Sequence, residues 1–230
     1  MGRPRRPAKG NSTVVLRQLA RPPVRNRPPG ADGVNSVPAM TIRPIVSQLD
    51  RRLSLLGFVR KGSAWNREVE QLTDVIDVQR SKFDETFTLN AAVAHRNLYR
   101  ICWDREAPKF MDEHRGIARA RIGDLIDGRD MWWRLSDTSV ADDVIDKTLT
   151  LIVPFLDRLH SLEAIEEFLV AKGIEKQSYP LPVIYLALIR CELGYKSAGC
   201  DLLRSLSSKT RSWKSNVEAV MSRIGCSFTS

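Results

Sequence analysis

Residues 71–94 read QLTDVIDVQRSKFDETFTLNAAVA, and this stretch decides the fold. Two runs rich in β-branched and aromatic residues, 72–82 and 86–94, alternate apolar with polar side chains and flank a polar turn centred on Asp84-Glu85. Alternation with a period of two is typical of a strand that buries one side. The stretch therefore predicts an antiparallel β-hairpin.

The position of the turn predicts which residues face one another. A turn centred on Asp84-Glu85 places Gln79 opposite Asn90, and paired residues share one side of the sheet. The polar side then carries Asp77, Gln79, Ser81, Thr88, Asn90 and Ala92, and the apolar side carries Ile76, Val78, Phe87, Leu89, Ala91 and Val93. The apolar side must pack on helices. The polar side is either a solvated surface, as is common in antiparallel sheets, or a shallow cleft in which Gln79 and Asn90 orient a ligand or a partner backbone.

The sheet is predicted to continue on either side of the hairpin. Further strands are predicted over 58–67, 118–125 and 131–135. The last two are separated by the turn-like Asp127-Gly128, whereas 98–116 has no clear period. Before the first strand, apolar residues at helical spacing between Ile42 and Leu56 predict a helix that ends at Gly57.

After Asp137 the pattern is helical to the end of the chain. Helices are predicted over 140–159, 162–172, 182–193, 198–206 and 212–223. Pro154 is expected to kink or divide the first one, and 185–206 has the look of one helical hairpin of the tetratricopeptide kind, without the further units of an array. The fold class is therefore α+β: an N-terminal helix and an antiparallel sheet of about five strands in 40–136, then a helical region in 137–230 packed on or beside the sheet.

The charge of the chain is concentrated before this domain. The formal net charge is +9, and residues 1–39 hold eight Arg or Lys against one acid, so only +2 belongs to 40–230. Seven of the twelve prolines also lie in 1–39, which predicts a disordered basic tail. Three interpretations stay open: a transit peptide, an arm that touches phosphates, or residues upstream of a true start at Met40.

The familiar catalytic and metal motifs are missing from the sequence. It contains no glycine-rich phosphate loop, no G-x-S-x-G elbow and no H-E-x-x-H helix. Ligand-like spacing is also absent among His95, His114 and His160. We therefore expect neither a metal nor a cofactor.

The cysteines and the hydropathy bear on the compartment. Neither a zinc site nor a disulfide scaffold is indicated by the spacing of Cys102, Cys191, Cys200 and Cys226, so reduced thiols are expected. No apolar run is long enough for a membrane helix or a signal-peptide core. A cytoplasmic protein that does not engage a membrane is the resulting prediction.

Two groups of residues are candidate surfaces. Neighbours on a strand point to opposite sides, so Trp133 and Leu135 are core candidates, while Trp132 and Arg134 look outward. An exposed Trp beside an Arg has the composition of a binding hot spot, although a helix over that side would make Trp132 a second core residue. An RNA-binding stripe, modest at most given the near-neutral domain, would consist of Arg60, Lys61, Arg67, Arg80 and Lys82 interleaved with Phe58 and Trp65.

A set of short motifs between Ile42 and Leu135 resembles a bacterial family catalogued as a domain of unknown function. The motifs are Leu56-Gly57-Phe58, Arg60-Lys61, Trp65-Asn66-Arg67, Gln79-Arg80-Ser81-Lys82-Phe83, Phe87-Thr88-Leu89-Asn90, Arg121-Ile122-Gly123, and Trp132-Trp133 with Leu135. Ala91 and Ala92 depart from the glycine-containing step expected after Asn90. The resemblance implies a fold and a bacterial source, agrees with a start at Met40, and implies no reaction.

The sequence thus predicts a binding or interaction module, of the accessory or immunity type that neutralises a toxin, rather than an enzyme. Its expected surface consists of Asp77, Gln79, Asn90, Arg121, Trp132 and Arg134, and its expected partner is a protein, with nucleic acid less favoured. One alternative is a metal-independent enzyme acting on a nucleotide or RNA through Arg80, Arg121 and Asp77; another is RNA binding without catalysis. An enzyme should have a concave pocket with a group of shifted pKa, and a module a flat aromatic-rich patch.

Overall fold

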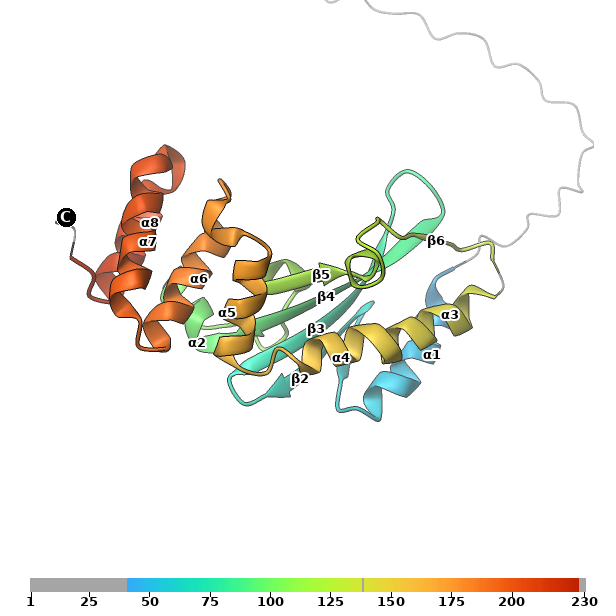
Figure 1. The fold of residues 1–230 in the computed structure, drawn as a ribbon. Coiled ribbons are helices and arrows are strands. Elements are labelled where there is room, and N and C mark those ends of the chain that lie inside the picture. The colour runs from blue at the N-terminus through green and yellow to red at the C-terminus, as the bar shows by residue number, and fades with distance from the viewer. Residues whose placement is uncertain (1–40, 138, 228–230) are drawn as a thin grey trace, which may run out of the picture. The chain divides into compact units, whose positions relative to one another are not determined.

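An antiparallel sheet with the predicted hairpin at its centre forms the middle of the fold (Figure 1). The structure, a computed structural model, describes residues 41–137 and 139–227; the predicted tail and the predicted start at Met40 lie outside these residues. The strands are β1 (Val59–Lys61), β2 (Ala64–Val69), β3 (Leu72–Arg80), β4 (Thr86–His95), β5 (Ala118–Arg121) and β6 (Trp133–Arg134). Strands β1 to β5 pair in sequence order, and β6 pairs with β4 beside its hairpin end.

Helices precede, interrupt and follow the sheet. They are α1 (Arg43–Ser54), α2 (Arg96–Trp103), α3 (Val140–Lys147), α4 (Val153–Asp157), α5 (Leu162–Ala171), α6 (Pro180–Glu192), α7 (Lys196–Lys209) and α8 (Lys214–Arg223). The predicted α+β class, with an N-terminal helix, an antiparallel sheet and a C-terminal helical region, is confirmed.

The predicted register of the β3–β4 hairpin is wrong by two residues. Asn90 lies opposite Asp77, and Gln79 lies opposite Thr88. The cause is a turn centred one residue earlier than Asp84-Glu85, closed by the backbone N–H of Ser81, which donates to the carbonyl of Thr86 at 2.9 Å. Because sides alternate with a period of two, a shift of two leaves every side chain on its predicted side.

The apolar side of the sheet carries the main core. Its buried residues include Ile76, Val78, Phe87 and Leu89, and α1, α4 and α5 cover this side (Figure 1). Helix α1 contributes the buried stripe Ile45, Val46, Leu49 and Leu53, and the predicted stop at Gly57 is confirmed by a left-handed φ of +85°. We call the opposite side of the sheet the outer face.

The outer face is polar at one end and covered at the other. Residues 98–116, which had no clear period, form most of α2 and a segment that crosses this face. Asn66 anchors the segment, because its side chain accepts from the backbone N–H of Met111 at 2.6 Å and donates to the Met111 carbonyl at 3.0 Å. A small second core with Val75 and Ala92 lies beneath it. The predicted polar side is therefore open only toward the hairpin end.

Two details of the predicted strands are wrong. The single strand predicted over 58–67 is the β1–β2 hairpin, because Gly62, with a φ of +68°, reverses the chain. The strand predicted over 118–125 ends at Arg121, where a short 3₁₀ turn over Ile122–Leu125 begins, and β5 and β6 both pair with β4. The alternation of side chains along a strand does not show which other strand it pairs with, so it could not reveal that β5 and β6 both pair with β4.

The helix predicted over 140–159 is divided, although not by a kink at Pro154 itself. A π-helical turn, Thr148–Ile152, joins α3 to α4, and the N–H of Val153 donates back to the Thr148 carbonyl. The wider turn precedes the proline, which cannot donate in the ladder. Farther on, α6 and α7 pack closely at Gly199, which has no side chain. A Cβ at this position would lie 2.5 Å from the Ala187 carbonyl oxygen.

The prediction of four reduced thiols is wrong for two of them. Cys200 in α7 and Cys226 after α8 form a disulfide, with a Cα–Cα distance of 5.6 Å. Helices α7 and α8 bring the two residues together across 26 positions, which spacing alone did not reveal. Cys102 and Cys191 are free. No helix in the described part of the chain is long and apolar enough to cross a membrane.

Candidate functional site

Five of the six residues predicted as a site lie together on the outer face. Asp77 and Gln79 come from β3, Asn90 from β4, Arg121 from the end of β5, and Trp132 from the residue before β6. Their order across the sheet follows from the pairing of Asp77 with Asn90 and of Asn90 with Arg121. Paired residues in neighbouring strands share a side of the sheet.

The guanidinium of Arg121 joins these residues. Its Nε donates to Asn90 Oδ1 at 3.3 Å, its Nη2 to Gln79 Oε1 at 3.4 Å, and its Nη1 to Asp130 Oδ1 at 2.7 Å. Asn90 Nδ2 also donates to Gln79 Oε1 at 2.9 Å. The Trp132 ring lies 5.3 Å from the guanidinium, and its Nε1 donates to Asp130 Oδ2 at 2.8 Å. Each guanidinium nitrogen has an acceptor, so the side chain is held in one orientation.

The loop after β5 explains why Ile122 and Gly123 follow Arg121. The N–H of Arg121 donates to Asp124 Oδ2 at 2.9 Å and starts a short 3₁₀ helix, and Ile122 is fully buried. A Cβ on Gly123 would lie 1.8 Å from the carbonyl oxygen of Arg129. Only glycine permits this approach, which folds residues 122–132 back and presents Asp130 to Arg121.

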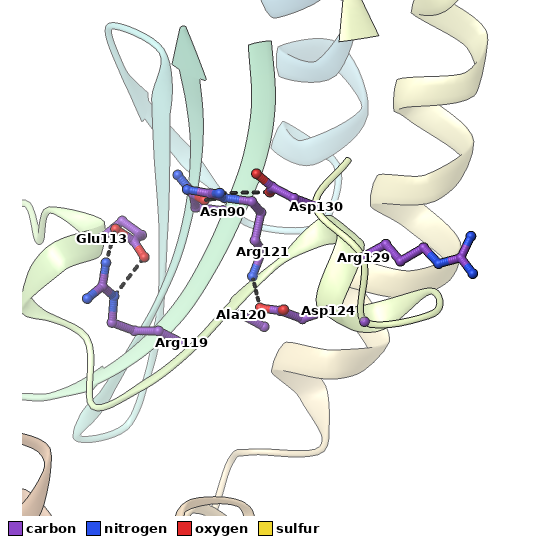
Figure 2. Close-up of a pocket in the computed structure, with 9 residues that line it drawn as sticks. Asn90, Glu113, Arg119, Ala120, Arg121, Asp124, Arg129 and Asp130 are labelled. Atoms are coloured by element: carbon purple, nitrogen blue, oxygen red, sulfur yellow. Dashed lines mark hydrogen bonds and ion pairs between the residues drawn. The ribbon is translucent and has the colours of Figure 1, made fainter. Parts of the chain in front are cut away.

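A pocket of about 410 Å³ opens beside this network (Figure 2). Its lining consists of Asn90, Glu113, Arg119, Ala120, Arg121, Asp124, Gly128, Arg129 and Asp130. Arg119 and Glu113 form a two-pronged ion pair of 2.8 and 2.9 Å on one side, while Arg129 points away from Arg121 on the other. Three arginines meet three carboxylates in the lining, so the pocket is polar and balanced in charge.

Two carboxyl groups of the network have pKa values that differ from the ordinary range. Burial raises the pKa of Asp77, and the nearby carboxylate of Glu113 raises it further. Hydrogen bonds donated by Trp132 and then by Arg121 lower the pKa of Asp130. Burial thus shifts the titration of Asp77 toward the neutral form, whereas hydrogen bonds shift that of Asp130 toward the charged form.

Arg134 is the predicted site residue that the structure places elsewhere. It pairs with Thr86 near the tip of the β3–β4 hairpin and is exposed, and it does not line the pocket. The prediction for the adjacent tryptophans agrees with the structure. Trp133 is buried and stacks on Phe87 at 5.5 Å, and Trp132 is half-buried on the outer face.

The arrangement proposed for the enzyme and for the RNA-binding stripe is wrong. Arg80 pairs with Phe87, a core residue, and therefore stands on the side of the sheet opposite Arg121. Trp65 and Phe58 are buried, so no aromatic side chains are exposed between the basic ones. Arg67 contacts carboxylates rather than solvent.

Sequence reasoning missed the residues that complete the pocket. One signal was present: Arg119 has the same parity as Arg121 along β5 and so shares its face. Glu113 and Asp130 lie outside the predicted strands, and Asp124 lies in a 3₁₀ turn within the stretch that was predicted to be a strand. Their placement depends on how residues 104–117 and 122–132 fold back over the sheet.

The comparisons with known proteins bear on this region. Residues 49–159 match a family described as "Domain of unknown function (DUF4304)". The match spans all the pocket and network residues and ends before α5, so helices α5–α8 lie outside it. Neither the curated proteins nor the solved structures give a match. The matched residues, 49–159, thus contain the whole candidate site.

A second polar cluster lies on the core side of the sheet. Asp74, fully buried in β3, accepts from Arg67 Nε at 2.8 Å and contacts His160 Nε2 at 3.0 Å. Arg67 also pairs with Asp157. Donor atoms of Asp74, Asp157 and His160 lie within 4.8 Å of one another, a spacing that could suit a metal ion. The guanidinium of Arg67 already pairs with both carboxylates, so the cluster is better explained as an ion-pair network that ties β2 and β3 to the α4–α5 turn.

Proposed function

We propose that the chain is a binding module whose outer-face pocket takes a polar, charge-bearing segment of a partner protein. The observation that supports this most is the immobilised Arg121. Its guanidinium is held by Asn90, Gln79 and Asp130 beside an open pocket, with Trp132 against it. Arginine and tryptophan are enriched at the centre of protein interfaces, where pre-ordered side chains lose little entropy on binding.

The charge balance of the pocket favours a protein segment over a nucleic acid. A polyanion is attracted by cations that outnumber nearby acids, and here Arg119, Arg121 and Arg129 are matched by Glu113, Asp124 and Asp130. A peptide segment offers amides and side chains of both signs, which such a lining can satisfy. An immunity-type protein that neutralises a toxin is the more specific form of the proposal.

The experiment is site-specific photo-crosslinking from the pocket. A photoreactive amino acid replaces Arg129, which is exposed on the pocket rim, in the full-length chain expressed in the source cells. We expect one protein to be cross-linked in stoichiometric amount and identified by mass spectrometry. The same substitution at the exposed Arg158 after α4 is the matched control and should capture nothing above background.

Two variants test whether the cross-link depends on the Arg121 network. Arg121→Gln and Trp132→Ala, each combined with the photoreactive residue at position 129, should abolish the cross-link because they remove the held guanidinium or the ring beside it. Equal capture from both positions, capture that survives Arg121→Gln, or RNA in place of protein would each contradict the proposal.

Asp77 supports a second candidate, an enzyme acting on a nucleotide or RNA. Its raised pKa, next to Asn90 at the edge of the pocket, is the feature expected of a general acid. The pocket lining, as the structure describes it, has no Cys, His, Ser, Thr or Tyr that could serve as a nucleophile. Turnover of nucleotides or RNA that Asp77→Asn abolishes would establish this alternative.

A further inference from the structure

A run of positive charge lies in the C-terminal helices, away from the outer-face pocket. Residues 202–217 contain Arg204, Lys209, Arg211 and Lys214 and no acid, although residues 40–230 together carry only +2. The stretch runs from α7 through a short 3₁₀ turn, Arg211–Trp213, into α8. These helices lie beyond the DUF4304 match and share no residue with the outer-face pocket.

Two aromatic rings stand beside these cations. Tyr179, which precedes α6, is 57% exposed, and its ring lies edge-on to the Trp213 ring at 6.4 Å. Trp213 is half-buried and is backed by Trp103 at 6.2 Å. Trp103 Nε1 donates to the Tyr185 hydroxyl at 3.1 Å, so the platform is anchored in the core while the Tyr179 face remains accessible.

The cations of this surface differ from those of the outer face. Within the described residues, neither Lys209 nor Arg211 lies within 4.0 Å of a carboxylate oxygen, and both side chains belong to exposed residues. The two cations and two rings line a hollow of about 620 Å³ together with Ser178, Pro180, Thr210 and Ser212. No acid is in that lining. Arg211 also lines an adjoining hollow that contains Arg204, Lys214 and Glu218, where Arg204 pairs with Asp201 and Lys214 with Glu218.

We propose that this basic–aromatic surface, formed by Tyr179, Lys209, Arg211, Trp213 and Lys214, binds single-stranded RNA. A flexible strand presents flat bases and phosphates in alternation. Tyr179 offers a face for a base, Lys209 and Arg211 offer unneutralised charge for phosphates, and the hydroxyls of Thr210 and Ser212 can hydrogen-bond a phosphate or a 2′-hydroxyl. A duplex keeps its bases stacked internally and cannot use the Tyr179 face.

The test is fluorescence anisotropy of a labelled 12-nucleotide oligouridine with the full-length protein. Lys209→Glu/Arg211→Glu should weaken binding at least tenfold and lower the slope of log affinity against log salt by about one to two, since each phosphate contact contributes about 0.7. The matched control is Arg51→Glu/Arg52→Glu, an equal charge change at two exposed residues of α1. Both double variants keep the eight cations of residues 1–39, so the contribution of that segment is common to both.

Substitutions of Tyr179 test the contribution of stacking separately from that of charge. Tyr179→Ala should weaken binding by about tenfold, because stacking on one base contributes about 1–3 kcal/mol, while Tyr179→Phe should bind like the wild type. DNA of the same sequence should bind more weakly if the hydroxyl contacts are to the 2′-hydroxyl, and an RNA duplex should bind least. Equal losses in the two double variants, no effect of Tyr179→Ala, or duplex binding as tight as the single strand would overturn the proposal.

Discussion

Arg67 and Arg121 stand on opposite sides of one sheet, and each guanidinium serves several acceptors. On the core side, Arg67 is 15% exposed and its partner Asp74 is completely buried. On the outer face, Arg121 is 33% exposed and its partner Asp130 is 56% exposed. A buried charge that loses its partner is destabilising, whereas an exposed pair contributes little. An arginine–carboxylate pair therefore stabilises the fold on the core side, whereas the pair on the outer face is available for binding.

The largest expected effect is on the core side. Asp74→Asn removes the buried charge that pairs with Arg67 and should lower the free energy of unfolding by about 3–5 kcal/mol. Urea unfolding followed by circular dichroism measures the change. Asp130→Asn is the matched change on the outer face and should cost less than about 1 kcal/mol. Equal losses of unfolding free energy in the two variants would contradict the distinction between a structural ion pair on the core side and a weakly stabilising one on the outer face.

The adjacent tryptophans at the start of β6 give the same comparison. Trp133→Ala removes a buried ring that stacks on Phe87 and should cost about 3–5 kcal/mol. Trp132→Ala removes a half-buried ring with a cation–π contact to Arg121 and should cost about 1 kcal/mol. Thermal unfolding of the two variants checks the order, and a larger loss for Trp132→Ala would contradict it.

The loop that carries Asp130 should respond to a single methyl group. Gly123→Ala forces the new Cβ against the Arg129 carbonyl oxygen and should cost about 1–3 kcal/mol. Gly128→Ala, in the same loop, meets no atom within 4 Å and tests the effect of its positive φ alone. Hydrogen exchange at residues 122–132 should rise more in the first variant than in the second, and the opposite order would show that the close approach is not what shapes the loop.

The smallest effect concerns the pH dependence of stability. Because the pKa of Asp77 is raised in the fold, its contribution is fully present at low pH and is lost as the pH rises through the folded pKa. Asp77→Asn removes this loss and keeps an acceptor for Asn90, so the variant should be more stable than the wild type near neutral pH. The difference should shrink below about pH 4. Urea midpoints at several pH values measure it, and a constant difference would contradict the assignment.

The sequence was sufficient for what depends on local period. The alternation in 72–82 and 86–94 predicted the correct side for Gln79 and Asn90, and the alternation around Trp133 did so for Trp132. The register was wrong by two residues, because the turn could be centred at either of two neighbouring positions. The helix before Gly57 and the helical C-terminal region were likewise predictable from spacing and stop signals.

What the sequence could not give depends on contacts between distant segments. His160 meets Asp74 across 86 positions, and the Cys200–Cys226 disulfide depends on the packing of α7 with α8. Asp130 reaches Arg121 only because Gly123 lets the loop fold back. None of these partners is marked by a repeat or a period, so only the three-dimensional arrangement identifies them.

The most direct test of the account is the affinity of the cross-linked partner, once purified, for Arg121→Gln. Isothermal titration calorimetry is performed on variant protein whose urea midpoint matches that of the wild type. We predict at least tenfold weaker binding, which corresponds to about 1.4 kcal/mol, from a side chain that contributes little to stability. An unchanged affinity would contradict the assignment of the outer-face pocket as the binding site.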